Sequence, residues 1–230
     1  MTNPGMWCFT WMPDRRAAAN GADKAALLKD AKWQSGDIIT VSFLDGDEAV
    51  IQKVIRYAQE WTTPGMADLT LDFRRDTTDT LVRISFRYPG SWSVVGTACR
   101  RITDQLRPTM NYGWLTPATA DDEVRRVVLH EFGHALGLIH EHQNPKGAIE
   151  WDRAAVIRDL SGPPNNWTAD QIEFNMFKPY QEAEVRATPV DRASIMLYPI
   201  PARWTTNGFS AGLNTDLSAD DRRLIREVYS

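Results

Sequence analysis

Hydrophobic positions change their spacing along the chain, and each spacing predicts an element. Residues 38–44 are rich in β-branched side chains and lie between two glycines, which predicts a strand. Apolar residues then recur at helical spacing over 47–61, which predicts an amphipathic helix with Asp47 as its cap. Further β-like segments follow at 69–73, 81–86, 91–98 and 109–115.

The second half of the chain has a different pattern. Three acidic residues at 121–123 precede a helical apolar pattern that continues to about Leu138, and negative charge favours the N-terminal end of a helix. Beyond Gly137 prolines and glycines are frequent and strand signals are few. Short helices are expected at 151–160, 169–177 and 219–229, the last two with capping residues.

These elements predict an α+β fold. An upper lobe, to about residue 137, would contain a twisted mixed sheet and two long helices. A lower, irregular lobe with short helices would cover 138–230, and the active-site cleft would lie between the lobes. Residues 1–32 are interpreted as an N-terminal arm, with an aromatic patch and a short helix at 23–32, and residues 33–230 as a single catalytic domain.

Composition narrows the class of protein. The 230 residues are 43% apolar, enough for one substantial core, and the net charge of −4 gives no reason to expect a nucleic-acid partner. No run of eighteen apolar residues occurs, so no membrane partner is predicted. The first twelve residues lack the basic segment of a secretory signal. A monomer is expected.

All four histidines lie between positions 130 and 142. His130 and His134 are four residues apart, so a helix places them on one face, and Glu131 lies at the edge of that face. Gly137 can end the helix in a conformation that other residues resist, which would bring His140 back as a third ligand. Three protein ligands leave zinc an open position, which indicates a catalytic Zn²⁺ site. Two histidines at this spacing alone would more often be a solvated helix face.

The extended pattern resembles that of the metzincin metallopeptidases, and Glu141 after the third histidine is similar to the astacin branch. The string Ser194-Ile195-Met196-Leu197-Tyr198 resembles the astacin Met-turn, with Leu197 where astacins commonly carry histidine. The resemblance implies a metzincin-like fold and a zinc endopeptidase that hydrolyses proteins or peptides. It also favours a secreted protein.

The chemistry of this class assigns roles to individual residues. Glu131 would be the general base for a zinc-bound water, and Tyr198 would donate a hydrogen bond to the oxyanion. The resemblance implies that Tyr198 binds zinc at rest, that Met196 underlies the metal and that Glu141 is a positioning residue, salt-bridged to a chain end. Substrate is expected to extend along an edge strand within 91–115.

Several alternatives stay open at this point. His142 is interpreted as a surface residue or as one that packs behind the ligands. Cys8 and Cys99 could form a disulfide or remain free, or Cys8 could bind the zinc as a thiolate. A zinc domain without catalysis is the second functional hypothesis. A third is a zinc site in which Glu173 or Glu182 replaces His140.

Overall fold

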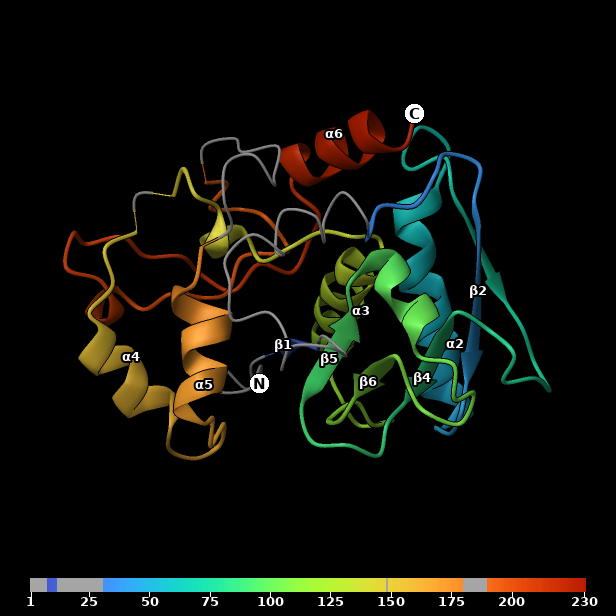
Figure 1. Cartoon of the computed structure of the whole chain (residues 1–230), viewed down its shortest axis with the longest axis horizontal. Coiled ribbons are helices and arrows are strands. Elements are labelled where there is room, and N and C mark those ends of the chain that lie inside the picture. The colour runs from blue at the N-terminus through green and yellow to red at the C-terminus, as the bar shows by residue number, and fades with distance from the viewer. Residues whose placement is uncertain (1–7, 12–30, 148, 180–189) are drawn as a thin grey trace.

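Six strands form one mixed sheet in the computed structural model, which describes residues 8–11, 31–147, 149–179 and 190–230 (Figure 1). The strands are β1 (Cys8–Trp11), β2 (Ile38–Phe43), β3 (Thr70–Phe73), β4 (Val82–Ser85), β5 (Ser91–Val94) and β6 (Met110–Tyr112). Their order across the sheet is β1-β5-β6-β4-β2-β3. All neighbours run parallel except β5 and β6, which are antiparallel.

The edge strand β1 is the main departure from the sequence prediction. It pairs in parallel with β5, from Cys8 opposite Ser91 to Trp11 opposite Val94. The other five strands lie where the pattern predicts them, although the strand expected at 91–98 ends at Val94. Residues Gly96–Arg101 form a 3-10 helix, η2, instead.

Two long helices, α2 (Glu48–Ala58) and α3 (Asp121–Ala135), share the main core with the sheet. Asp47 caps α2 as predicted, because its carboxylate accepts the Ala49 N–H at 2.8 Å. The predicted helix continues as a 3-10 turn, η1 (Gln59–Thr62), whose Trp61 indole donates to the Leu129 carbonyl at 3.0 Å. This contact fixes α3 against the preceding helix.

Shorter helices form the rest of the described chain, and α4 and α5 lie on the opposite side of the molecule from β2 (Figure 1). They are η3 (Glu141–Gln143), α4 (Arg153–Leu160), α5 (Ala169–Ile172), the π-helix η4 (Glu173–Phe177), η5 (Ala202–Trp204) and α6 (Ala219–Val228). Both predicted capping pairs form: Thr168 with Gln171, and Ser218 with Asp221. Most of the helix expected at 23–32 lies outside the described residues.

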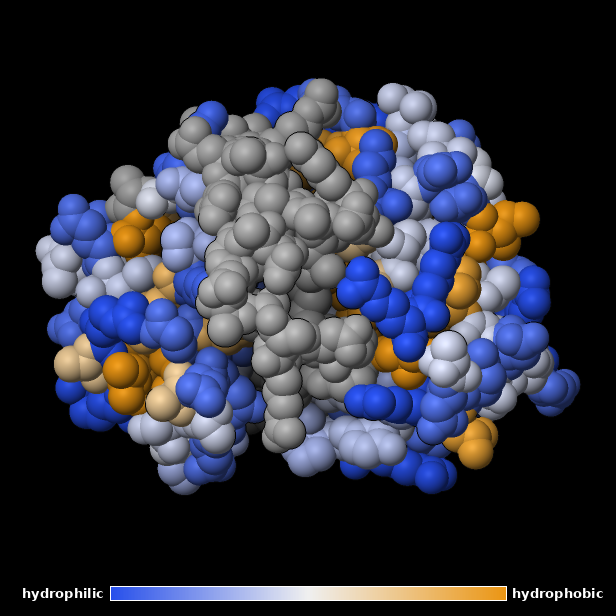
Figure 2. Space-filling model, in the orientation of Figure 1, coloured by the Kyte–Doolittle hydropathy of each residue, from blue (hydrophilic) through white to orange (hydrophobic). Residues whose placement is uncertain are grey.

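The mixed sheet with helices confirms the predicted α+β class. On the face shown in Figure 2, the described residues are mostly polar, with apolar residues in separate patches. The large exposed hydrophobic side chains of the described residues come from different segments: Ile38, Tyr88, Leu106 and Ile157. None of the helices in the described ranges is both long and apolar enough to span a bilayer.

Candidate metal centre

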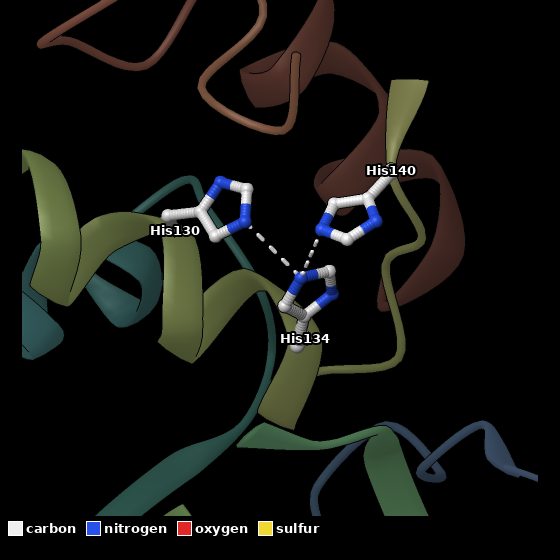
Figure 3. Close-up of side chains that lie close together, drawn as sticks. All are labelled: His130, His134 and His140. Carbon is white, nitrogen blue, oxygen red and sulfur yellow. Dashed lines mark hydrogen bonds between the residues drawn. The ribbon is translucent and has the colours of Figure 1, made fainter. Parts of the chain in front are cut away.

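The three predicted histidine ligands meet in the structure (Figure 3). His130 and His134 project from α3, and His140 returns toward them from the chain that follows the helix. His134 Nε2 lies 3.2 Å from His130 Nε2 and 3.1 Å from His140 Nε2. All three rings are buried, and within the described part of the chain they are the only group of this kind able to hold a metal ion.

The other ring nitrogens decide which tautomers are present. His130 Nδ1 donates to the Ile195 carbonyl and His134 Nδ1 donates to the Leu138 carbonyl, each at 2.8 Å. A neutral imidazole carries one proton, so the Nε2 atoms of these two rings face each other as lone pairs. Such an arrangement is repulsive unless a cation lies between them.

Zinc fits this donor set. Neutral imidazoles bind it at about 2.0–2.1 Å, which in a tetrahedral site separates the nitrogens by about 3.3 Å, close to the distances observed. Burial lowers the pKa of His130 and His140 well below the usual value and that of His134 to about 4, and neighbouring imidazoles lower the pKa of His130 and His140 further. The rings are therefore neutral at pH 7 and need no deprotonation to bind the metal.

Gly137 ends the zinc helix. Its φ of +96° lies in the region that favours glycine, and its N–H donates to the His134 carbonyl at 2.8 Å. The Leu138 N–H donates to the Gly133 carbonyl at 2.9 Å, which closes a Schellman-type turn. The helix therefore stops at Ala135, three residues before the predicted end, and the turn delivers the Leu138 carbonyl to His134.

Two aromatic residues that lie far apart in the sequence cap this turn. The Trp33 indole N–H donates to the Ala135 carbonyl at 2.8 Å, and the Tyr229 hydroxyl donates to the Leu136 carbonyl at 2.5 Å. The last carbonyls of a helix have no partner within it, so these side chains satisfy groups that would otherwise be buried without one. Neither residue is predicted for the site, since nothing in its local sequence connects it to the helix.

Met196 lies directly against the zinc helix. A side chain on Gly133 would come within 2.4 Å of the Met196 sulfur, so the thioether fills the space that this glycine leaves. The Met196 carbonyl accepts the Glu141 N–H at 3.0 Å, which ties the turn to the segment after His140. Gly133 was not predicted as a site residue, because its position in the zinc motif does not specify a residue type.

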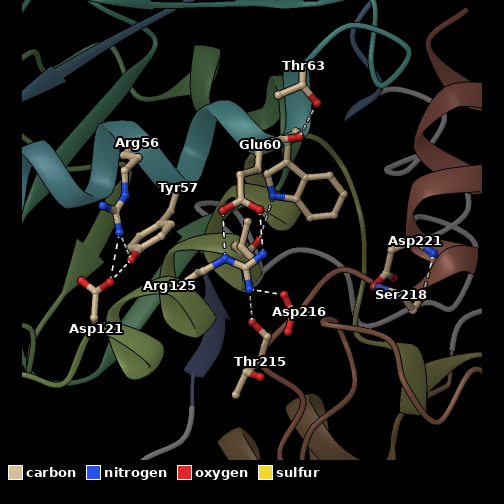
Figure 4. A network of polar contacts seen from close by, with 12 residues as sticks. Arg56, Tyr57, Glu60, Thr63, Asp121, Arg125, Thr215, Asp216, Ser218 and Asp221 are labelled. Carbon is tan, nitrogen blue, oxygen red and sulfur yellow. Dashed lines mark hydrogen bonds and ion pairs between the residues drawn. The ribbon is translucent and has the colours of Figure 1, made fainter.

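Arg125 joins α3 to two other segments through polar contacts (Figure 4). Arg125 of α3 donates to Glu60 at 2.7 and 2.9 Å and to the Thr215 carbonyl at 2.9 Å, and it also pairs with Asp216. It thereby connects the zinc helix to η1 and to the segment before α6.

The Met-turn is fixed by the first turn of α6. Asp221 accepts the Ser194 hydroxyl at 2.7 Å and the Ile195 N–H at 2.8 Å. The Ile195 carbonyl is the group that orients His130. Asp221, a capping residue of α6, therefore contacts the same residue, Ile195, whose carbonyl orients His130.

We expect Asp221→Asn to lower the free energy of unfolding by about 1–3 kcal/mol, because an NH₂ group replaces one of the two buried carboxylate oxygens and the donors to that oxygen lose their acceptor. Denaturant unfolding of the metal-free protein measures this. The matched control is Asp220→Asn: that side chain is 47% exposed and pairs with Arg223, so its loss should change stability by less than about 0.5 kcal/mol. Equal losses in the two variants would contradict the role assigned to Asp221.

Tyr198 lies among the imidazoles. Its ring centroid is 4.3 Å from that of His140, 4.8 Å from that of His142 and 5.8 Å from that of His130. His142 is buried, so the surface position considered for it is wrong, and its ring packs against the ligand His140. The sequence placed Tyr198 near the metal only through the family resemblance.

The two glutamates of the motif have different environments. Glu131 is fully buried on α3, one residue from His130. Glu141 Oε1 accepts the Asp191 N–H at 3.1 Å and the Asn144 amide at 3.3 Å, and burial raises the pKa of Glu141 to about 7.

The structure bears on two of the alternatives left open by the sequence: the state of the cysteines, and a glutamate as the third zinc ligand. Cys99 is buried and forms no disulfide, and burial raises the pKa of its thiol to about 11. The side chain of Cys8 lies outside the described atoms. Glu173 pairs with Arg153, with half of its side chain exposed, and Glu182 lies outside the described residues.

No protein-family model and no curated protein matches the chain. Solved structures do. One structure of myroilysin superposes with a TM-score of 0.82 at 41% identity, over 88% of this chain and 97% of that one. A crystal structure of myroilysin gives a TM-score of 0.70 at 37% identity, over 98% of this chain and 91% of that one.

Proposed function

Because the chain belongs to the metzincin metallopeptidases together with myroilysin and is a zinc metalloendopeptidase, we propose that Glu131 is its general base and Tyr198 its oxyanion donor. One observation carries the proposal: three buried Nε2 atoms converge beside the helix that also holds Glu131. The substrates are proteins, whose peptide bonds the enzyme hydrolyses.

The proposed mechanism divides the work between the metal and the side chains. When bound by the three histidines, zinc supplies a positive charge that lowers the pKa of water toward about 7 and polarises a peptide carbonyl. Glu131 accepts a proton from the attacking water and later passes it to the leaving amine. The Tyr198 phenol donates a hydrogen bond to the oxygen on which negative charge develops.

The other motif residues support this machinery. Gly137 permits the turn that brings His140 back, and Met196 fills the space under the helix at Gly133. We assign the chain to the astacin-like branch because Glu141 follows His140 directly and because Ser194–Tyr198 resembles the astacin Met-turn, with Leu197 as its departure. Glu141 then acts as a positioning residue, since its buried carboxyl links the third ligand's segment to the main chain at Asp191.

Strand β5 is the proposed substrate-binding strand. It is antiparallel to β6 on one side, and main-chain pairing along its other side would hold any extended peptide. That side is taken by β1, which belongs to the arm. We therefore divide the chain into an inhibitory arm, residues 1–32, and a catalytic domain, residues 33–230.

We expect a protein that starts at Ala31 to be more active than the full chain. This start keeps Ala31 and Trp33, which are buried against the catalytic region. A tethered strand competes at an effective concentration in about the millimolar range, so its removal should raise kcat/KM about tenfold or more. Hydrolysis of a quenched peptide measures the change.

Adding a synthetic peptide of residues 1–30 to the shortened protein supplies the control, and it should inhibit competitively. A shortened protein with unchanged melting temperature and zinc content but no gain in activity would contradict the inhibitory role of β1. That result would leave the assignment of Glu131 untouched.

The proposed function itself is tested by incubating zinc-loaded enzyme with casein and a panel of quenched peptides, followed by proteomic profiling of the cleavage sites. New peptide termini that appear only with zinc support it. One equivalent of bound zinc without cleavage of any substrate would favour the zinc domain that lacks catalysis.

A further inference from the structure

The fourth histidine, His142, has no role in the mechanism proposed above, yet its ring is buried against His140 and Tyr198. His142 belongs to η3, two residues after the third ligand, and only 5% of its surface is exposed. A histidine that served only to fill space would be an unusual choice in such a position, because its two nitrogens must both be satisfied or left at a cost.

One nitrogen of His142 is anchored. Nε2 donates to the Asn175 carbonyl at 2.6 Å, in the last turn of the π-helix η4. Carbonyls in a last turn have no partner within the helix, and Gln143 uses two others in the same way, donating to Phe174 at 2.7 Å and to Lys178 at 3.0 Å. Two consecutive side chains of η3 thus cap η4, which fixes the plane and the direction of the His142 ring.

The other nitrogen, Nδ1, is buried and accepts no hydrogen bond from the described residues. Because Nε2 carries the ring proton, Nδ1 is a lone pair without a donor. A phenylalanine would fill the same space without that cost. The value of histidine here must therefore lie in the anchored orientation of its ring.

The anchored His142 ring packs against a predicted zinc ligand and against Tyr198. It stacks on His140, with centroids 5.2 Å apart and planes 18° apart, and it lies tilted against Tyr198, with centroids 4.8 Å apart and planes 30° apart. Trp151 meets it edge-on at 6.0 Å. The Tyr198 ring therefore packs against both His140 and the anchored His142 ring, which also contact each other.

We propose that His142 is a positioning residue for Tyr198: the Asn175 carbonyl fixes its imidazole, and the imidazole fixes where the phenol stands relative to the zinc ligands. This inference rests on the proposed role of Tyr198. His142 itself binds neither metal nor substrate. Because its effect on catalysis depends on Tyr198, an experiment can distinguish this role from a general contribution to packing.

The experiment compares His142→Phe, which keeps a ring but loses the anchor, with His142→Ala, which loses both. 3-Fluorotyrosine is placed at position 198, and its ¹⁹F signal is recorded in the metal-free and zinc-loaded proteins. We expect the signal of both variants to shift and broaden, most in His142→Ala. Because a misplaced catalytic group can cost about 10²-fold, kcat should fall about 10- to 100-fold with little change in KM.

Two further variants separate the possible outcomes. In a Tyr198→Phe background, replacing His142 should cause no further fall in kcat, since the group through which it acts is already gone. Val156→Ala, in the buried face of α4, controls for loosened packing and should lower the melting temperature without moving the ¹⁹F signal. An equal fall in kcat with and without the tyrosine hydroxyl, or an unchanged ¹⁹F signal in both His142 variants, overturns the inference.

The proposed function can fail separately. If Tyr198→Phe alone leaves kcat unchanged, the catalytic role of the phenol is wrong. The ¹⁹F signal still decides whether His142 positions the ring.

Discussion

Replacing Glu131 with glutamine should lower kcat by about 10²–10⁴-fold, the usual contribution of a general base, while one equivalent of zinc stays bound. Glutamine has nearly the same shape as glutamate, so it fits the fully buried position on α3. It cannot accept a proton from water at neutral pH. The three imidazoles that bind the metal are unchanged, and the loss is therefore confined to the chemical step.

Hydrolysis of casein and of quenched peptides measures the loss, and elemental analysis measures the zinc. Asp122→Asn is the matched control, because it removes a carboxylate from the exposed first turn of the same helix. It should retain full activity. Undiminished cleavage by Glu131→Gln would remove this residue from the mechanism, whereas a loss of zinc from that variant would show that the substitution disturbs the ligands.

The zinc ligands could be predicted from the sequence because their geometry is local. Spacing along a helix places His130 and His134 on one face, and Gly137 marks the point where the chain must turn. The same reasoning fails for contacts between distant segments. The strand β1 forms only because it pairs with β5, in which Ser91 lies opposite Cys8, and no pattern within Cys8–Trp11 specifies that distant partner.

The burial of His142 could not be predicted for the same reason: it depends on contacts with residues that are distant in the sequence. Its environment comes from Tyr198 and from the end of η4, both more than thirty residues away, and sequence spacing from His140 says nothing about either. Trp33 and Tyr229 are a further example, since they are 196 residues apart in the sequence and meet at the turn after the zinc helix. Local patterns thus predict the ligands, and tertiary packing supplies what orients them.

Main-chain carbonyls orient two of the three ligands. The His130 ring donates a hydrogen bond to the Ile195 carbonyl, and the His134 ring donates one to the Leu138 carbonyl in the turn that ends α3. Partners of this kind hold the ring plane and the tautomer of a metal-binding histidine. Because Asp221 fixes Ile195 from a third segment, the orientation of the first ligand depends on the closing helix of the chain.

Replacing His140 with alanine should weaken zinc binding by about 10²–10³-fold. Four-ligand zinc sites provide roughly 10–16 kcal/mol of binding free energy, so one ligand accounts for about 3–4 kcal/mol. The remaining imidazoles are preorganised by their main-chain partners and should still bind the metal weakly. Competition with a chromogenic chelator measures the affinity, and thermal unfolding of the metal-free variant confirms that it folds.

The same measurement decides between His140 and a downstream glutamate as the third ligand. Glu173→Gln is the matched control, since its carboxylate pairs with Arg153 on the surface and should leave zinc affinity unchanged. If affinity instead fell in Glu173→Gln and survived in His140→Ala, the third ligand would be the glutamate. His140 Nε2 lies 3.1 Å from His134 Nε2 in a buried cluster of neutral rings, and this geometry favours loss of zinc in His140→Ala alone.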